Sequence, residues 1–287
     1  MFARPFVLGC LIAALLPDAL SAQQMAQAAV DTAFDQIAQN VGQQGLTVVA
    51  SIDHARLAEA EGVQMPASRV LIFSDPTTNT AILSSVLRAG LDLPFRALAY
   101  DDDGKTAVVY TGADFLGARH GVTDAGVLDG FDRTVSHAVA GLTDAAVRPA
   151  PTEGLTTDYG VVELQSAYDF RTTVERLKAV IAAQSDTIWF GSVDFSADAN
   201  ALGVDLLPAT ILLFGGPKPG GVAMAEFPAI GLDAFCQKLF IFEDDDGEVF
   251  VLFNDIEALA RLHYGRSIPP HAILNQRLVS GFADAIK

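Results

Sequence analysis

One segment of the chain, TVVASIDHARLAEAEGVQMPASRVLIFSDP at residues 47–76, recurs in altered form 141 residues later. Asp53 returns as Asp194, and Pro76 returns as Pro217. A period of this length exceeds the repeating unit of a solenoid, so the repeated object is a whole small domain. A site that both copies inherited should show the same residue types twice, and we weigh each candidate residue by that criterion.

The two copies share a predicted order of helices and strands. Each starts with an amphipathic helix, whose apolar side chains recur at i, i+4, i+7 and i+11 and form one stripe that faces a core. These side chains are Val30, Phe34, Ile37 and Val41 in the first copy, and Phe170, Val174, Leu177 and Ile181 in the second.

A strand, a short Ala-rich helix and a second strand follow in each copy. Asp53 and Asp194 stand where the first strand gives way to the short helix, and Gly62 and Gly203 stand where that helix ends. The second strand is apolar at successive positions, which predicts a central strand that is buried on both faces. The predicted strands cover residues 46–52 and 69–73, with counterparts at 187–193 and 210–214.

Each copy continues with a hairpin and two further helices. The hairpin turns contain Asp103-Gly104 and Asp246-Gly247, where glycine supplies the positive φ of a tight turn. We predict that the last helix runs from about Leu128 to Val147 in the first copy and from about Ala272 to Lys287 in the second. The predicted hairpin strands are 95–100 with 107–111, and 237–242 with 249–254.

The chain divides into a first α+β repeat at residues 23–147, a linker at 148–158 and a second α+β repeat at 159–287. The linker is marked by its prolines and glycine. Residues 159–165, YGVVELQ, predict a strand that opens the second copy. The first copy has no counterpart of this strand, so we expect the two halves to differ at that edge of the sheet.

Residues 1–22 are typical of a signal peptide, which predicts a periplasmic or secreted protein. Arg4 supplies the positive start, Phe6–Leu16 is an apolar run too short to cross a bilayer, and small residues precede Gln23. An uncleaved anchor is the alternative. Cleavage would remove Cys10 and leave Cys236 alone, so the core rather than an internal disulfide must hold the protein together.

Composition and charge restrict the class of partner. The chain has 287 residues, of which 51% are hydrophobic, and its formal net charge is −17. Such an acidic surface is a poor match for nucleic acid, and without a basic amphipathic face it predicts no membrane attachment after signal cleavage. The remaining partner classes are an unknown small molecule or a protein, in addition to the pairing of the two repeats within the chain.

The repeated pattern resembles a bacterial family catalogued as domain of unknown function 302. The resemblance rests on residues 47–76, Gly90-Leu91-Asp92-Leu93-Pro94 and Ala118-Arg119-His120-Gly121. It implies two homologous compact α+β domains, each a mostly antiparallel sheet packed by helices, arranged as an intramolecular pseudo-dimer. It implies no activity. The second copy departs from the pattern, because Phe195 stands where His54 is expected and Ala234-Phe235 replaces Leu93-Pro94.

Five residues are candidates for a binding site. Asp53-His54 follows a strand and is a helix cap, a polar contact to a ligand or an acid/base pair, and Asp194 is expected to cap the equivalent helix. His120 and His263 occupy matching positions at helix ends, where they favour the negative end of the helix dipole or contact a ligand. We predict no metal and no cofactor, because the chain has no cluster of Cys and His at metal-ligand spacing.

Two other motifs favour structural roles. The triple-aspartate turns at Asp101–Asp103 and Asp244–Asp246 lack the ligand spacing of a calcium loop and are predicted to be solvated hairpin turns. The glycine-rich stretch Gly215–Gly221 lacks the ending of a phosphate-binding loop and is predicted to be an irregular connection from strand to helix. The chain also lacks a GxSxG elbow, so we predict no catalytic residues.

These observations favour an exported, non-enzymatic module that binds a small ligand or a protein at the groove between the two repeats. The alternative is an enzyme or metal-dependent site in the first repeat, built from Asp53, His54 and His120. Such a site would have to bring His54 and His120 together in a concave pocket. A third reading is assembly through the sheet edge where the first copy lacks its strand.

Overall fold

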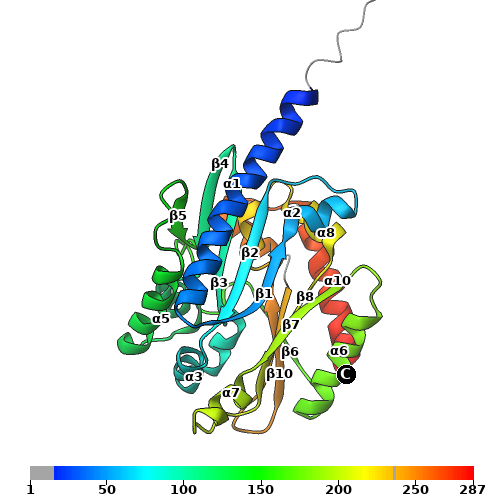
Figure 1. Ribbon diagram of the computed structural model, residues 1–287. Helices are drawn as coiled ribbons and strands as arrows, with labels where there is room; N and C mark the ends of the chain where they lie inside the picture. Colours follow the sequence, from blue (N-terminus) through cyan, green and yellow to red (C-terminus); the bar gives the residue numbers. More distant parts are fainter. Residues whose placement is uncertain (1–15, 235–236) are drawn as a thin grey trace, which may run out of the picture.

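The computed structural model describes residues 16–234 and 237–287, which form two five-stranded sheets with helices packed on them (Figure 1). The predicted α+β fold is confirmed. The first sheet is antiparallel except at its last pair, β4 and β5, which run parallel. Its strand order is β1 (Thr47–Asp53), β2 (Ser68–Ser74), β3 (Phe95–Asp102), β4 (Lys105–Tyr110) and β5 (Ala146–Pro149).

The second sheet repeats the first four strands and is antiparallel throughout. Both β2 and β8 lie inside their sheets and are almost completely buried, as their unbroken apolar sequences predict. The strand order is β6 (Val161–Gln165), β10 (Val249–Asn254), β9 (Gln237–Glu243), β8 (Ala209–Gly215) and β7 (Ile188–Asp194).

The two halves differ at one sheet edge, as we predicted. In the second sheet β6 opens its repeat and pairs antiparallel with β10, whereas in the first sheet β5 comes after the last helix of its repeat and pairs parallel with β4. The first two residues of the predicted linker, Arg148 and Pro149, therefore lie in a strand. The edge that the first copy was expected to leave open is occupied by the chain itself.

The predicted end of the helix before β5 was wrong. That helix, α5 (Ala125–Ala138), ends well before Val147, and the residues that we assigned to its last turns lie in a loop and in β5. Gly141 has a φ of 74°, a left-handed conformation that a continuing helix cannot include. Strand pairing with β4 then takes over from helical hydrogen bonding.

The predicted amphipathic helices are α1 (Leu16–Gln43) and α6 (Phe170–Ala183). The stripe of α1 is buried against the first sheet, and α6 packs beside α10 on the second, as Figure 1 shows in blue and in green and red. The first turns of α1 extend beyond the sheets. The remaining helices are α2 (His54–Ala60), α3 (Pro76–Ser85), η1 (Leu87–Asp92), α4 (Ala113–His120), α7 (Phe195–Ala201), α8 (Pro217–Met224), η2 (Pro228–Leu232), α9 (Ile256–Tyr264) and α10 (Pro269–Ile286).

The two repeats pack as a pseudo-twofold pair. Helix α2 of the first repeat contacts α8 of the second, and α3 contacts α7. Because α7 is the counterpart of α2 and α8 is the counterpart of α3, these two contacts are equivalent. The 3-10 helices do likewise, because η1 lies against β9 and η2 against β3. Strands β1 and β7 lie side by side at the centre of Figure 1. Most of the buried apolar side chains of both repeats form one continuous core.

Glycines permit this close approach. A Cβ atom on Gly90 would lie 2.2 Å from the ring of Phe240, and one on the equivalent Gly231 would lie 3.0 Å from the imidazole of His54. Gly221 belongs to the glycine-rich stretch, and a Cβ there would lie 2.6 Å from Ala58. That stretch is therefore more regular than we predicted, because Pro217 to Gly221 form the first turns of α8.

The predicted signal peptide falls mostly outside the described residues, as do Cys10 and Cys236. Its predicted cleavage region, up to Ala22, lies within α1. From Leu16 onward, and leaving residues 235–236 aside, no helix combines the length and the hydropathy that a bilayer span requires.

Candidate functional site

Both predicted helix caps are present. Asp53 precedes α2 and accepts a hydrogen bond from the Arg56 amide at 2.9 Å, and Asp194 precedes α7 and accepts one from the Ala197 amide at the same distance. The surroundings of the two carboxylates differ. Asp53 also forms an ion pair of 2.6 Å with the Arg56 guanidinium, whereas Ala197 stands at the position of Arg56 in the second repeat.

His54 lies inside the protein, at the contact between the repeats. Its Nδ1 is 3.0 Å from the hydroxyl oxygen of Ser68, and Gly231 of the second repeat lies against its ring. Burial lowers the pKa of His54 from 6.5 to about 3. The imidazole is therefore neutral at physiological pH and is shielded from solvent.

His120 and His263 end equivalent helices in different environments. His120 is buried, and its Nε2 donates a hydrogen bond of 2.7 Å to Asp92. His263 is half-buried, and burial lowers its pKa to about 4 although the charge of Asp233 acts in the opposite direction. Among the described residues, the hydrogen bonds of His54 and His120 go to different partners, Ser68 and Asp92.

Asp92 is the centre of a buried charge cluster that was not among the candidate sites of the sequence analysis. Its carboxylate accepts hydrogen bonds from Arg119 at 2.7 Å and from His120, and it lies 3.2 Å from the nearest nitrogens of both Arg96 and Lys238. All five side chains are almost completely buried. Burial alone would raise the pKa of Asp92, but the charges of Arg119 and Lys238 and the His120 hydrogen bond hold it well below its ordinary value.

The cluster crosses the interface reciprocally. Arg96 of the first repeat lies 3.0 Å from the Asp233 carboxylate of the second, and Lys238 of the second reaches Asp92 of the first. Arg96 pairs with Ile72 in one sheet and Lys238 pairs with Leu213 in the other, so the two cations occupy equivalent sheet positions.

Two pKa shifts follow from this arrangement. Burial raises the pKa of Asp233, but the charges of Arg96 and Lys238 outweigh it and lower that pKa. Burial and the charge of Arg96 lower the pKa of Lys238, an effect that the two aspartates partly offset. Each charge is thus held by partners from both repeats, as buried ions require.

Arg119 also connects the cluster to the second repeat, through hydrogen bonds. Its guanidinium donates to the Asn254 side chain at 2.8 Å and to the backbone carbonyls of Tyr159 and Gly160 at 2.9 and 3.2 Å. In the second repeat Leu262 stands at the position of Arg119, so the second repeat has no equivalent of these hydrogen bonds. The cluster fixes the relative orientation of the repeats.

A signal for the cluster was present in the sequence. Arg96 and Lys238 are single charged residues near the start of otherwise apolar strands, and each follows an aspartate that both copies retain. A charge at the same place in two central strands indicates a buried partner. Periodicity within one repeat does not identify that partner, because it lies in the other repeat.

A groove of about 400 Å³ lies where the two repeats meet beside β1 and β7. The first repeat contributes Thr47, Ser74 and Pro76, and the second contributes Asp194 and Asp198. The groove is lined by hydroxyl, apolar and carboxylate side chains. The sequence analysis assigned its candidate ligand site to such a groove, and that assignment stays a prediction.

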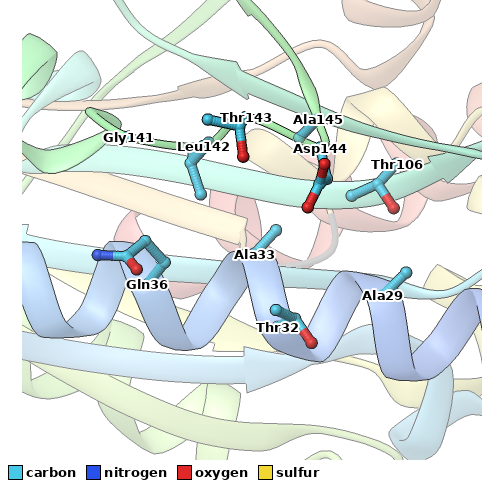
Figure 2. A pocket seen from close by; sticks show the side chains of 10 residues that line it. All are labelled: Ala29, Thr32, Ala33, Gln36, Thr106, Gly141, Leu142, Thr143, Asp144 and Ala145. Carbon is cyan, nitrogen blue, oxygen red and sulfur yellow. The ribbon is translucent and has the colours of Figure 1, made fainter.

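A second cavity, of about 380 Å³, lies between α1 and the loop that precedes β5 (Figure 2). Thr32, Ala33 and Gln36 line it from the helix, and Leu142 and Asp144 line it from the loop. All of its lining residues belong to the first repeat. It depends on the loop that leads into β5, which the second repeat lacks.

The triple-aspartate turns are hairpin turns, as predicted. Asp103 and Gly104 both have positive φ, 53° and 83°, and close a two-residue turn between β3 and β4. Asp244 accepts hydrogen bonds from the backbone amides of Asp246 and Glu248. Within residues 16–234 and 237–287, no group of three or more His, Cys, Asp and Glu side chains is arranged to hold a metal ion.

The fold and the interface define a tandem α+β protein built from two copies of one domain. A family model described as "Domain of unknown function DUF302" matches residues 22–140 and 162–278. These segments cover most of the chain, and the chain therefore belongs to this family, with two copies of its domain.

Three further similarities accompany the family match. A Fluoride-specific ion channel FluC 1 of Brucella suis biovar 1 is 34% identical over 106 residues, which are 37% of this chain and 41% of that protein. FluC 2 of Brucella melitensis biotype 1 is 34% identical over 106 residues, 37% and 38% of the two chains. The chain thus spans about two fifths of these relatives. An uncharacterized conserved DUF302 protein from Bacillus stearothermophilus has a TM-score of 0.37 and 16% identity, covering 45% of this chain and 98% of that one.

Proposed function

We propose that this protein is an exported, non-enzymatic binding module whose ligand occupies the groove between the repeats. The observation that carries this proposal is that both repeats line the groove, at the junction of β1 and β7. Ligand sites commonly form at such interfaces between domains, where concave surfaces of a few hundred Å³ arise without distorting either core.

The buried charge cluster supports the proposal by keeping the groove in one shape. Asp92, Asp233, Arg96 and Lys238 connect the repeats through ion pairs that water does not screen. A groove between rigidly held domains is preformed, so a ligand loses little free energy to ordering them.

The alternative, an enzyme or metal-dependent site built from Asp53, His54 and His120, has less support. Asp53 is occupied as a helix cap, His54 is enclosed against Gly231, and His120 is engaged by Asp92. A general acid or base must come within hydrogen-bond reach of a substrate, and two of these side chains are buried away from solvent.

Export rests on the N-terminal sequence alone. The positive start at Arg4, the apolar run Phe6–Leu16 and the small residues before Gln23 have the order of a cleaved signal. Mass spectrometry of the protein recovered from a periplasmic fraction should find an N-terminus near Gln23. Recovery of the full chain from the cytoplasm would contradict export without affecting the proposed ligand site.

The ligand site can be tested by blocking it. Ser192→Phe fills the groove, and Thr32→Phe fills the cavity of Figure 2 as a matched control, because both side chains are exposed. In a thermal-shift screen of metabolites, a compound that stabilises the wild-type chain should also stabilise Thr32→Phe but not Ser192→Phe. The opposite pattern would assign binding to the other cavity, and a screen in which no compound stabilises the chain would count against a binding module.

A further inference from the structure

The duplication supplies an internal comparison for one part of the core. In the first repeat the Phe95 ring stacks on the rings of Phe73 and Phe131, with ring centroids 5.4 and 4.5 Å apart. All three rings are completely buried. Rings stacked in this way pack a protein interior densely. The stack therefore fills the core of the first repeat between β2, β3 and α5.

The second repeat carries a glutamine in this place. Gln237 of β9 lies opposite Phe214 of β8, in the register in which Phe95 lies opposite Phe73. It is only 7% exposed, and its side-chain nitrogen donates a hydrogen bond to the Ala234 carbonyl. That bond identifies the nitrogen end of the amide, because a carbonyl oxygen can only accept. The other end, Oε1, is buried and has no hydrogen-bond partner among the described residues.

A second ring of the stack is also replaced in this repeat. Leu274 of α10 stands at the position of Phe131, because the next residue along each helix, Asn275 or Asp132, accepts a hydrogen bond from the first amide of the preceding helix. Replacing rings with smaller side chains leaves space in a core. A cavity of about 40 Å³ lies here between β8, α8 and α10, and the counterparts of all three stacked rings line it.

The walls of the cavity restrict the chemistry of an occupant. Most of its lining is apolar and includes Ile256, Leu278 and Pro219. Among the lining residues that the structure describes, Arg277 alone is charged, and the Asp186 carboxylate holds its guanidinium at 2.6 and 2.7 Å. An ion in this cavity would lose its hydration without gaining a free counter-charge, which is costly. The cavity therefore favours a neutral molecule.

We propose that this cavity binds a short-chain alcohol, whose hydroxyl donates a hydrogen bond to Gln237 Oε1 and whose alkyl group lies against Phe214 and Leu274. A buried acceptor costs free energy until a donor reaches it. A buried water takes up roughly 10–15 Å³ of cavity volume, so about three or four non-hydrogen atoms fit. A primary amide of this size would bring a carbonyl oxygen that the apolar walls leave unpaired. The site is separate from the groove, so the inference does not depend on the proposed function.

Methyl NMR of the full chain tests this proposal. Titration with 2-propanol should give saturable shifts at the methyl resonances of Leu274 and Leu278, with the millimolar dissociation constant expected for so small a ligand. Acetone has the same carbon skeleton and no donor, and it should give no saturable shift. Equal saturable shifts with acetone would overturn the inference. So would the absence of a saturable shift with 2-propanol, which would leave the cavity to water.

Variants locate the binding. Gln237→Phe introduces the residue of the first repeat, which fills the cavity and removes the acceptor, so the shifts with 2-propanol should be lost. Gln237→Met keeps the length of the side chain without the amide oxygen and should weaken binding at least tenfold. Ser192→Phe, which blocks the groove, should leave binding unchanged. Full binding in Gln237→Met would contradict the role of the carbonyl, and loss in Ser192→Phe would place 2-propanol in the groove instead.

Discussion

Asp92 shows how a single buried charge can depend on two domains. Its carboxylate has partners from its own repeat, Arg119 and His120, and one from the other repeat, Lys238. Removing a charge from water is costly, and the cost is recovered only when every partner is present. Removing any one partner therefore leaves an uncompensated charge in the interior.

Replacing Asp92 with Asn should destabilise the protein strongly. The substitution leaves buried cations without a counter-charge, which typically costs about 3–5 kcal/mol of unfolding free energy. Asp158→Asn is the matched control, because Asp158 pairs with Arg88 in an exposed position where the loss should stay below about 1 kcal/mol. Urea denaturation of both variants measures the difference. Equal, small effects would show that Asp92 does not organise the interface.

His54 should make the protein less stable as the pH falls below neutrality. The unfolded chain protonates this imidazole near its ordinary pKa of 6.5, but the folded chain does so only near 3. Between these values the unfolded state binds more protons, so the contribution of His54 is complete above pH 6.5 and declines as the pH decreases.

His54→Phe tests this pH dependence, because phenylalanine already occupies the equivalent position as Phe195. The unfolding free energy of the wild type, relative to the variant, should fall by up to about 1.4 kcal/mol per pH unit between pH 6 and 4. His137→Gln, at an exposed position, should preserve the wild-type slope. Parallel profiles for wild type and His54→Phe would refute the assignment.

Residue roles were predictable from the sequence only where they are local. Asp53 and Asp194 cap the helices that follow them, and a cap is defined by its position within a few residues of chain. The role of His54 depends on Gly231, which lies in the other repeat. The partners of Asp92 likewise come from elements distant in the chain, and no spacing within one repeat indicates them.

At the level of elements, the close contacts between the repeats depend on glycines, which have no side chain. Gly90 lies in η1, facing the ring of Phe240 in β9, and Gly231 occupies the equivalent place in η2. The Phe240 ring is completely buried and cannot move aside. The distance between the 3-10 helix and the facing strand is therefore set by glycine.

Gly90→Ala should reduce the unfolding free energy by about 1–3 kcal/mol, the usual cost of overpacking a core. Gly42→Ala is the matched control, because a Cβ there meets nothing within 4 Å and alanine favours the α1 helix. Phe240→Leu should restore part of the loss when it is combined with Gly90→Ala. Thermal unfolding of the three variants measures these effects, and a stable Gly90→Ala protein without rescue would contradict this packing.

The elements themselves were largely predictable because the sequence pattern of each one occurs twice. The strands, hairpin turns and amphipathic helices occur where their periodicities place them. Strand β5 was not predictable, because all four of its residues are exposed and carry no apolar alternation. Its hydrogen bonds come from β4, more than thirty residues earlier in the chain, and Gly141 provides the break that separates it from α5.

At the level of the whole molecule, the shared core and the shared charges should hold the repeats together without a covalent connection. A protease site inserted at Glu153-Gly154, in the exposed tether, allows the chain to be cut there. After cleavage the fragments should elute from a size-exclusion column as one particle with the mass of the uncut chain, by light scattering. Two separate peaks would show that the pairing depends on the tether.

Each repeat carries a cation that pairs with an aspartate of its own repeat and with the equivalent aspartate of the other, since Arg96 contacts Asp92 and Asp233, and Lys238 contacts Asp233 and Asp92. Loss of any one of these four charges leaves the remaining buried charges without a full set of partners. Exchange of one half with a diverged sister gene would separate charges that belong together. We therefore expect the four positions to change together, if they change at all, among related tandem proteins.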